Sequence, residues 1–142
     1  MASYDAGTLT NQSKRSARIY KDLNLDFQQN TATKDIEKLT DVESVKRSVR
    51  NLINLNHYEK PFHPEIGSNL RAMLFELLTP QMTHVISKQI TMLIQNYEPR
   101  CRLTQVNTMA NQDRNGYSVS ISFYVVNSPE PVQVETFLER LR

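Results

Sequence analysis

Apolar residues in the middle of the chain recur at three- and four-residue steps, the spacing of amphipathic helices that bury one face. The first run follows Thr40-Asp41-Val42-Glu43, a capping-box sequence in which the Thr40 hydroxyl and the Glu43 carboxylate would bond free N–H groups at a helix start. A second, short helix is expected after residue 68, and a third at Thr79-Pro80, a cap followed by proline. The apolar faces of these two helices would comprise Leu70, Leu74, Leu77 and Leu78, and then Met82, Val85, Ile86, Leu93, Ile94 and Tyr97.

Beyond Pro99 the apolar positions alternate with polar ones, which predicts β-strands. A strand with one buried face is expected over residues 118–125, and Asn115-Gly116 predicts a turn that makes residues 101–109 its antiparallel partner. A short strand is also predicted at residues 23–27, where Leu23, Leu25 and Phe27 alternate with polar residues. The tail after Pro131 fits either a terminal helix or a strand, and we favour the strand, whose pattern is carried by Val132, Val134, Thr136 and Leu138.

The stretch KPFHPEIG, residues 60–67, holds two prolines and a glycine and is therefore predicted to be a stiff loop rather than a regular element. Phe62 and Ile66 are expected to pack inward from it. Together these elements indicate an α+β fold in which a small antiparallel sheet packs against two or three helices.

A length of 142 residues suits one main domain, which we place at residues 21–142. Residues 1–20 are rich in Ser, Thr, Asn and basic side chains, which indicates a flexible, extended N-terminal arm. A basic cluster at the end of this arm and the start of the domain, Lys14, Arg15, Arg18 and Lys21, is interpreted as a solvated tail, with a phosphate-binding arm as the alternative. A net charge of +2 from 17 basic and 15 acidic residues gives no indication of a nucleic-acid partner. The sequence also lacks a run of about 18 apolar residues, which a membrane-spanning helix would need, so no membrane partner is expected.

Candidate catalytic chemistry is sparse in the sequence. His57, His63 and His84 lack the paired spacing of zinc ligands, and Cys101, the single cysteine, is interpreted as a small buried hydrophobe, so we expect no metal and no cofactor. Four carboxylates are candidates in principle for glycoside hydrolysis, which needs two facing each other across a cleft. These are Glu59, Glu65, Glu76 and Glu98, and no spacing in the sequence brings two of them together. No catalytic residue is therefore assigned.

The order KPFHPEIGSNLRAMLFELLTP, then a helix ending in NYEPR, then a β-hairpin resembles the baseplate wedge protein family of contractile-tailed bacteriophages. That family carries the label lysozyme-like and includes a baseplate component of type VI secretion systems. The resemblance covers about residues 20–142. Its loop-and-helix signature falls on Pro61, Phe62, Pro64, Gly67, Leu70, Leu74 and Phe75, and its hallmark tripeptide on Glu98-Pro99-Arg100.

This resemblance implies a non-enzymatic, late structural protein of the virion, assembled into the tail baseplate in the host cytoplasm. It implies that Glu98, Pro99 and Arg100 contact the helical core bundle of the other wedge proteins, and that the sheet is a platform for the first ring of tail sheath subunits. Pro61, Phe62, Pro64 and Gly67 are further partner-binding candidates. A peptidoglycan hydrolase, as the label suggests, is the alternative from another functional class, and a nucleic-acid-binding module using the basic arm is a third.

The predicted contacts of the Glu98-Pro99-Arg100 element and of the strand edge each have a physical mechanism. An arginine can fork onto a carboxylate or onto backbone carbonyls, so the Glu98-Pro99-Arg100 element suits a desolvated docking site. The alternative is that Glu98 bonds locally and Arg100 only covers the sheet. For the sheath, an unpaired strand edge offers N–H and C=O groups to a strand from a neighbouring subunit. The candidate edge lies at residues 132–140, with Val132, Val134, Thr136 and Leu138 as its residues.

Overall fold

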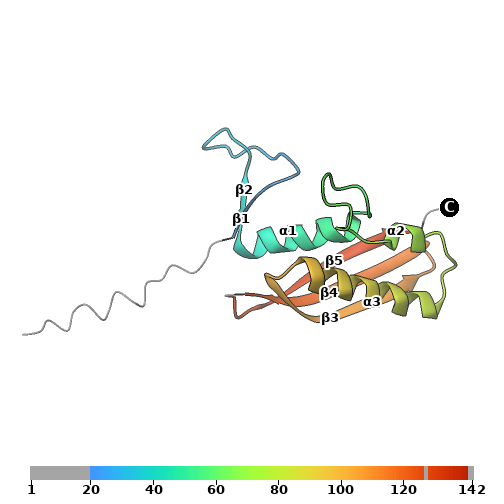
Figure 1. Ribbon diagram of the computed structural model, residues 1–142. Helices are drawn as coiled ribbons and strands as arrows, with labels where there is room; N and C mark the ends of the chain where they lie inside the picture. Colours follow the sequence, from blue (N-terminus) through green and yellow to red (C-terminus); the bar gives the residue numbers. More distant parts are fainter. Residues whose placement is uncertain (1–19, 127, 141–142) are drawn as a thin grey trace, which may run out of the picture.

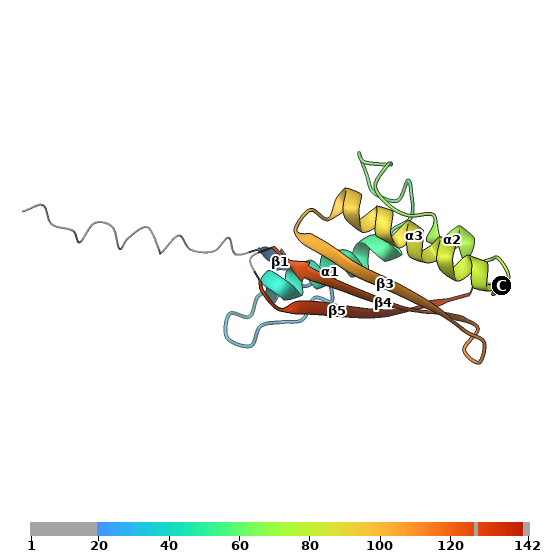
Figure 2. The same ribbon diagram turned by 90° about the horizontal axis from the view of Figure 1, so that it is seen from below.

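The computed structural model describes residues 20–126 and 128–140, and it forms the α+β fold that the sequence predicts. Strands β3, β4 and β5 make one antiparallel sheet in sequence order, and β1 and β2 make a separate two-stranded sheet. The helices α1 and α3 lie on the same face of the larger sheet, as Figures 1 and 2 show. The elements are β1 (Lys21–Leu23), β2 (Lys38–Thr40), α1 (Asp41–Asn54), α2 (Leu70–Met73), α3 (Pro80–Tyr97), β3 (Cys101–Asn111), β4 (Gly116–Val125) and β5 (Pro131–Glu139). Residues 1–19 of the predicted N-terminal arm lie outside the described residues.

The core lies between the helices and the central strand β4. Every second residue of β4 is buried, which confirms the predicted alternation, and the serines between them face the other side of the sheet. The helices contribute their own apolar stripes, in which Ile90 is fully buried although it was not among the residues predicted, whereas Val85 is exposed. The fully buried apolar residues of the core are Val45, Val49, Ile86, Ile90, Ile94, Tyr117, Val119, Ile121 and Phe123.

The helices α1 and α3 begin where the sequence predicts, but only α3 has the predicted side-chain cap. The Thr79 hydroxyl accepts a hydrogen bond from the Met82 N–H at 3.2 Å, and Pro80 opens α3, as predicted. At α1 the start is also where the sequence places it, yet the Thr40 side chain makes no capping bond. Instead, the Asp41 carboxylate accepts from the N–H of Tyr20 at 3.1 Å, and the Asp41 N–H donates to the Tyr20 carbonyl at 2.7 Å. A contact with the chain that enters β1 therefore replaces the expected capping box.

Two predicted elements are shorter than their patterns indicated. The second helix ends at Met73, because the N–H groups of Phe75 and Glu76 bond carbonyls three residues back, at 3.3 and 3.2 Å, and the chain unwinds toward Thr79-Pro80. Leu77 is consequently 69% exposed rather than buried. The strand predicted over residues 23–27 ends at Leu23, since Phe27 has a φ of 53° and its N–H turns back to the carbonyl of Asn24 at 3.0 Å.

The remaining predictions concern the tail and the loop. The tail is strand β5, so the favoured interpretation is confirmed and the terminal helix is wrong. The stretch over residues 60–67 is irregular, as predicted. Ile66 packs against the core, but Phe62 points outward and is 97% exposed, so its predicted inward packing is wrong. With φ at 65°, the backbone of Phe62 turns in the left-handed region between Pro61 and Pro64 and directs the ring away from the core.

Candidate partner-binding sites

The junction of α3 and β3 holds the Glu98-Pro99-Arg100 element. Glu98 is the C-cap of α3, and its N–H bonds the Ile94 carbonyl at 2.9 Å. Its side chain is buried, and Arg100 donates to it from two nitrogens, Nε to Oε1 at 2.6 Å and Nη2 to Oε2 at 2.7 Å. The hydroxyl of Ser48, which lies on α1, donates to the same Oε2. Glu98 is therefore satisfied within the chain and connects α1 to the start of the sheet.

The electrostatics of this junction favour the charged pair. Burial raises the pKa of the Glu98 carboxyl, but the hydrogen bonds from Arg100 and Ser48 outweigh that effect, and the pKa lies below its ordinary value. The hydrogen bond to Glu98 likewise raises the pKa of Arg100 above its ordinary value. Arg100 keeps 28% of its side chain exposed, lies 5.6 Å from the ring centroid of Tyr20, and follows the exposed Pro99. Of the predicted trio, Glu98 thus faces inward, while Pro99 and one side of Arg100 face outward.

Cys101 follows directly after the trio. Burial and the nearby Glu98 charge raise the pKa of its thiol to about 11, and Sγ lies 3.4 Å from the Glu98 carbonyl oxygen. A thiol with so high a pKa is a poor nucleophile at neutral pH. This supports the interpretation of Cys101 as a small hydrophobe.

The loop candidates divide into two groups. Pro61, Phe62 and Pro64 are exposed at its tip. Gly67 is buried at its base with a φ of +143°, and a Cβ placed there would lie 2.6 Å from both the carbonyl carbon and the oxygen of Asn56. That position requires glycine for close approach of the two backbone segments that close the loop.

The strand candidates lie on β5, an edge strand of the sheet. The side chains of Val132, Val134 and Leu138 are buried in the core and Thr136 is partly buried, so these four candidates could pair with a partner strand only through the backbone edge of β5. The Arg140 N–H bonds the Asn115 carbonyl at 3.0 Å, and hydrogen-bonded pairs alternate along an antiparallel ladder. By that alternation the N–H and C=O groups of Gln133, Glu135 and Phe137 point away from β4.

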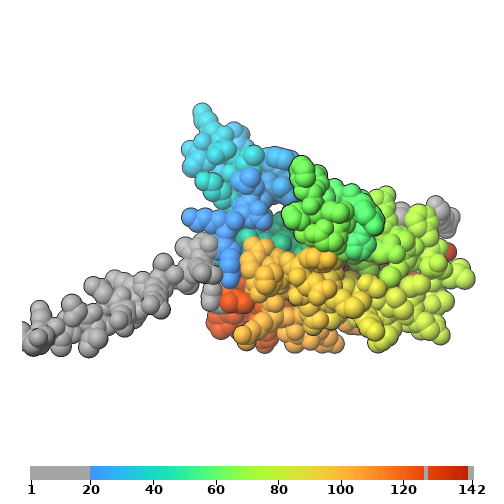
Figure 3. Space-filling view, in the orientation of Figure 1, coloured from blue at the N-terminus to red at the C-terminus, as the bar shows by residue number. Residues whose placement is uncertain are grey.

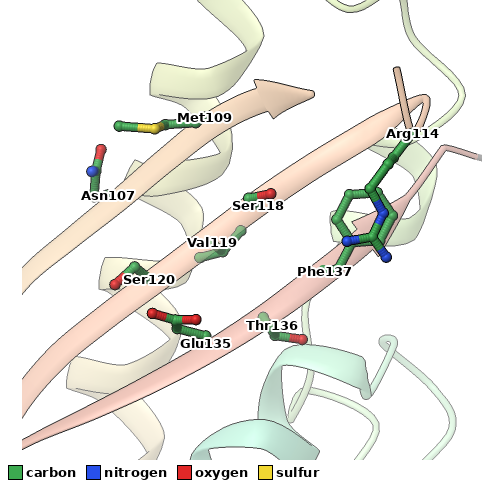
Figure 4. Close-up of a pocket in the computed structure, with 9 residues that line it drawn as sticks. All are labelled: Asn107, Met109, Arg114, Ser118, Val119, Ser120, Glu135, Thr136 and Phe137. Atoms are coloured by element: carbon green, nitrogen blue, oxygen red, sulfur yellow. The ribbon is translucent and has the colours of Figure 1, made fainter. Parts of the chain in front are cut away.

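The sequence did not reveal a trough of about 340 Å³ on the sheet face opposite the helices, shown in Figure 4. Ser118 and Ser120 lie along its length between taller side chains on β3 and β5. At one end the Arg114 guanidinium lies 4.2 Å from the ring centroid of Phe137. Among the predicted site residues only Thr136 lines this trough. The signal for it was the row of small serines on a strand whose other face is apolar.

Three of the carboxylates considered for catalysis, Glu59, Glu65 and Glu98, have lowered pKa values. Hydrogen bonds from Asn56 lower the pKa of Glu59, and hydrogen bonds from the Glu65 backbone and from His63 lower the pKa of Glu65. A glycosidase acid needs the opposite, a raised pKa. Within residues 20–126 and 128–140, no three metal-ligating side chains gather, and no helix is long and apolar enough to cross a bilayer.

Comparison with known proteins gives the family. The model of the family "Baseplate wedge protein gp25" matches residues 39–130. Baseplate wedge protein gp25 of Enterobacteria phage T4 is 28% identical over 116 residues, covering 82% of this chain and 87% of that protein. The fold is shared with a chain of the anti-feeding prophage baseplate, at a TM-score of 0.68 and 19% identity over 79% of this chain and 90% of that one. It is also shared with a putative tail lysozyme from Geobacter sulfurreducens, at a TM-score of 0.65 and 15% identity over 70% of this chain and 91% of that one. The chain therefore belongs to the baseplate wedge protein gp25 family, structural proteins of the contractile tail baseplate in the virion.

Proposed function

We propose that this chain is a structural subunit of the inner baseplate wedge, that it docks on the core bundle of the other wedge proteins through the α3–β3 junction, and that it offers β5 to the first ring of sheath subunits. Family membership supports the structural role. The observation that carries the docking is the partly exposed side chain of Arg100, held in one orientation by its two hydrogen bonds to the buried Glu98. A fixed, charged donor next to an exposed proline suits a partner that supplies carboxylates or carbonyls.

The roles within the trio differ in this proposal. Arg100 and Pro99 touch the partner, and Glu98 is a positioning residue that fixes Arg100 from inside the chain. An Arg100→Lys substitution keeps the charge but loses the planar fork, so it is expected to weaken binding to co-expressed wedge proteins. Arg102→Lys, two residues further along the chain on an exposed position of β3, is the matched control and should bind as the unaltered chain does. Equal affinities of the two variants would contradict docking through Arg100.

The sheath platform rests on the backbone edge of β5. Pro131, at the start of the strand, has no N–H, and the next outward-facing donors are those of Gln133, Glu135 and Phe137. A strand from a sheath subunit that pairs there would use these groups and would leave the core contacts of Val132 and Val134 intact. Deleting the strand would remove buried residues, so a change confined to one outward N–H is the sharper test.

Glu135→Pro removes one such N–H without touching the ladder to β4, and Glu135→Ala changes only the side chain. We expect baseplates that carry Glu135→Pro to initiate sheath polymerisation poorly and those that carry Glu135→Ala to initiate it normally. Negative-stain electron microscopy of tails assembled from purified sheath protein measures the difference. Normal sheath growth on Glu135→Pro baseplates would remove β5 as the platform.

The alternative function, peptidoglycan hydrolysis, has one point in its favour, the fold shared with a protein named a putative tail lysozyme. At 15% identity that likeness concerns the fold alone. The lowered pKa values of Glu59, Glu65 and Glu98 disfavour a general acid among them. Release of muropeptides from purified cell walls by the chain, abolished by substitution of one glutamate, would establish the enzyme instead; we expect none.

A further inference from the structure

The loop formed by residues 56–68 carries two aromatic side chains that face solvent. Phe62 is 97% exposed and Tyr58 is 85% exposed, more than any other large apolar side chain in the described part of the chain. In Figure 3 this segment, in green, stands out from the surface beside α3. Leaving aromatic rings in water gives up the free energy that their burial would contribute. The loop is able to bury apolar side chains, since Ile66 of the same loop packs against the core.

The backbone that presents these rings is also unfavourable. Tyr58 has a φ of 69° and Phe62 a φ of 65°, both in the left-handed region that bulky residues rarely adopt. Such conformations persist only where the surrounding contacts fix them, and they gather at functional sites. Two of them in one short loop, each under an exposed aromatic ring, call for a common explanation.

Hydrogen bonds at the base of the loop hold it closed. The Ser68 N–H donates to the Leu55 carbonyl at 2.8 Å. The Glu59 carboxylate accepts from both the N–H and the Nδ2 of Asn56, each at 2.8 Å. Gly67 lets the two sides of the base approach closely. The exposed rings therefore stand on a fixed support.

The tip of the loop is fixed in the same way. The Tyr58 N–H donates to the Pro64 carbonyl at 3.0 Å, and the hydroxyl of Tyr97, on α3, donates to the Glu65 carbonyl at 2.8 Å. Proline at 61 and at 64 restricts the remaining backbone freedom. A rigid aromatic side chain loses little entropy on binding, which is the property of binding hot spots.

We propose that Phe62 and Tyr58 form an anchor that inserts into an apolar pocket of a neighbouring protein of the baseplate, at a surface separate from Arg100 and from β5. The proposal rests on the baseplate role put forward above. Beside the loop, a groove of about 180 Å³ lies along α3, and its lining combines polar side chains such as Gln89 and Asn96 with Met92, which is 39% exposed. The loop carries two carboxylates, Glu59 and Glu65, against the single ammonium group of Lys60, a balance that does not favour an anionic membrane as the occupant.

The test uses the full chain and a wedge complex made by co-expressing the other wedge proteins of the same baseplate. Phe62→Gly and Tyr58→Gly each remove a ring and relieve the left-handed backbone. We expect each to weaken association at least tenfold in biolayer interferometry, while the melting temperature of the isolated chain stays the same or rises. Phe27→Gly is the matched control, because Phe27 is 72% exposed with a φ of 53° but lies on the projecting segment between β1 and β2. It should leave association unchanged.

Each other outcome overturns the anchor. Unchanged association of Phe62→Gly and Tyr58→Gly with a complex that still binds the unaltered chain removes the anchor and leaves the proposed function standing. Equal weakening by Phe27→Gly indicates a general need for apolar surface. A lowered melting temperature in either loop variant makes the rings part of the fold. Co-sedimentation with phosphatidylcholine–phosphatidylglycerol vesicles that Phe62→Gly abolishes makes the ligand a membrane. If the unaltered chain does not bind the wedge complex, the baseplate role and the anchor fail together.

Discussion

The α3–β3 junction and the loop of residues 56–68 place their characteristic side chains in opposite environments. At the junction, the charged carboxylate of Glu98 is buried, and each of its oxygens accepts a hydrogen bond. At the loop, the apolar rings of Phe62 and Tyr58 are in water. The junction therefore contributes to folding, whereas the loop leaves its apolar surface in water. Polarity alone would have assigned these two roles the other way round.

The largest effect on stability is expected at the base of the loop, which should behave differently from its exposed tip. Gly67→Ala would place a Cβ 2.6 Å from the carbonyl carbon and oxygen of Asn56 at a φ of +143°. Overpacking and backbone strain together should lower the free energy of unfolding by about 3 kcal/mol. Urea unfolding of the isolated chain measures this change. Phe62→Gly, five residues away at the tip, is the control and should not destabilise the chain; a loss of similar size there would show that base and tip form one structural unit.

Arg100→Ala is expected to have the next largest effect. It leaves the buried carboxylate of Glu98 with only Ser48 as a partner, and because Arg100 is partly exposed we expect a loss of about 2–3 kcal/mol in the free energy of unfolding. Lys46→Ala breaks the exposed 2.7 Å ion pair to Glu43 on α1 and should cost about 0.5 kcal/mol or less. Equal urea midpoints for the two variants would mean that the junction does not brace the fold.

Acidification should weaken the junction. The pKa of Glu98 is lowered in the folded chain, so its contribution to stability is complete above its ordinary value of 4.5 and is lost as the pH falls through the folded value. The difference in urea midpoint between the unaltered chain and Glu98→Gln should therefore shrink from pH 7 to pH 3. Comparing the two chains removes the parallel contributions of Asp26, Glu59 and Glu65, whose pKa values are also lowered by hydrogen bonds. A gap that stays constant or widens on acidification would contradict the assignment.

The elements that sequence reasoning predicted well depend on residues close together in the chain. Thr79-Pro80 starts α3 because cap and proline act within one turn, and the alternation of β4 follows from a strand with a single buried face. The orientation of Glu98 depends on Ser48, fifty positions earlier, and no local pattern reveals that contact. Likewise the capping box at Thr40 failed because Asp41 found a partner in Tyr20, on the chain that enters β1.

The sequence predicted which residues belong to the candidate sites, but not whether their side chains face the core or solvent. The resemblance to the family selected Glu98, Arg100 and Phe62, but it did not say which of them face inward. Phe62 was expected to pack inward because phenylalanine usually does, and the left-handed turn of its backbone reverses that preference. The strand β5 was predicted from its side-chain pattern. That pattern could not show which backbone N–H and C=O groups of β5 stay unpaired at the edge of the sheet.

The rate of thiol alkylation compares the buried junction with the exposed loop without unfolding the chain. With a pKa of about 11, the Cys101 thiol beside the junction is about 0.1% thiolate at pH 8, whereas an exposed cysteine with a pKa of about 8.5 is about 20% thiolate. In a chain that combines Cys101→Ser with Phe62→Cys, the loop thiol should therefore react with iodoacetamide on the order of 10²-fold faster than Cys101 does in the unaltered chain. The rates are measured by mass spectrometry of quenched samples. Similar rates would mean that the junction opens to solvent about as readily as the loop, and its buried hydrogen bonds could then not hold Arg100 in place for a partner.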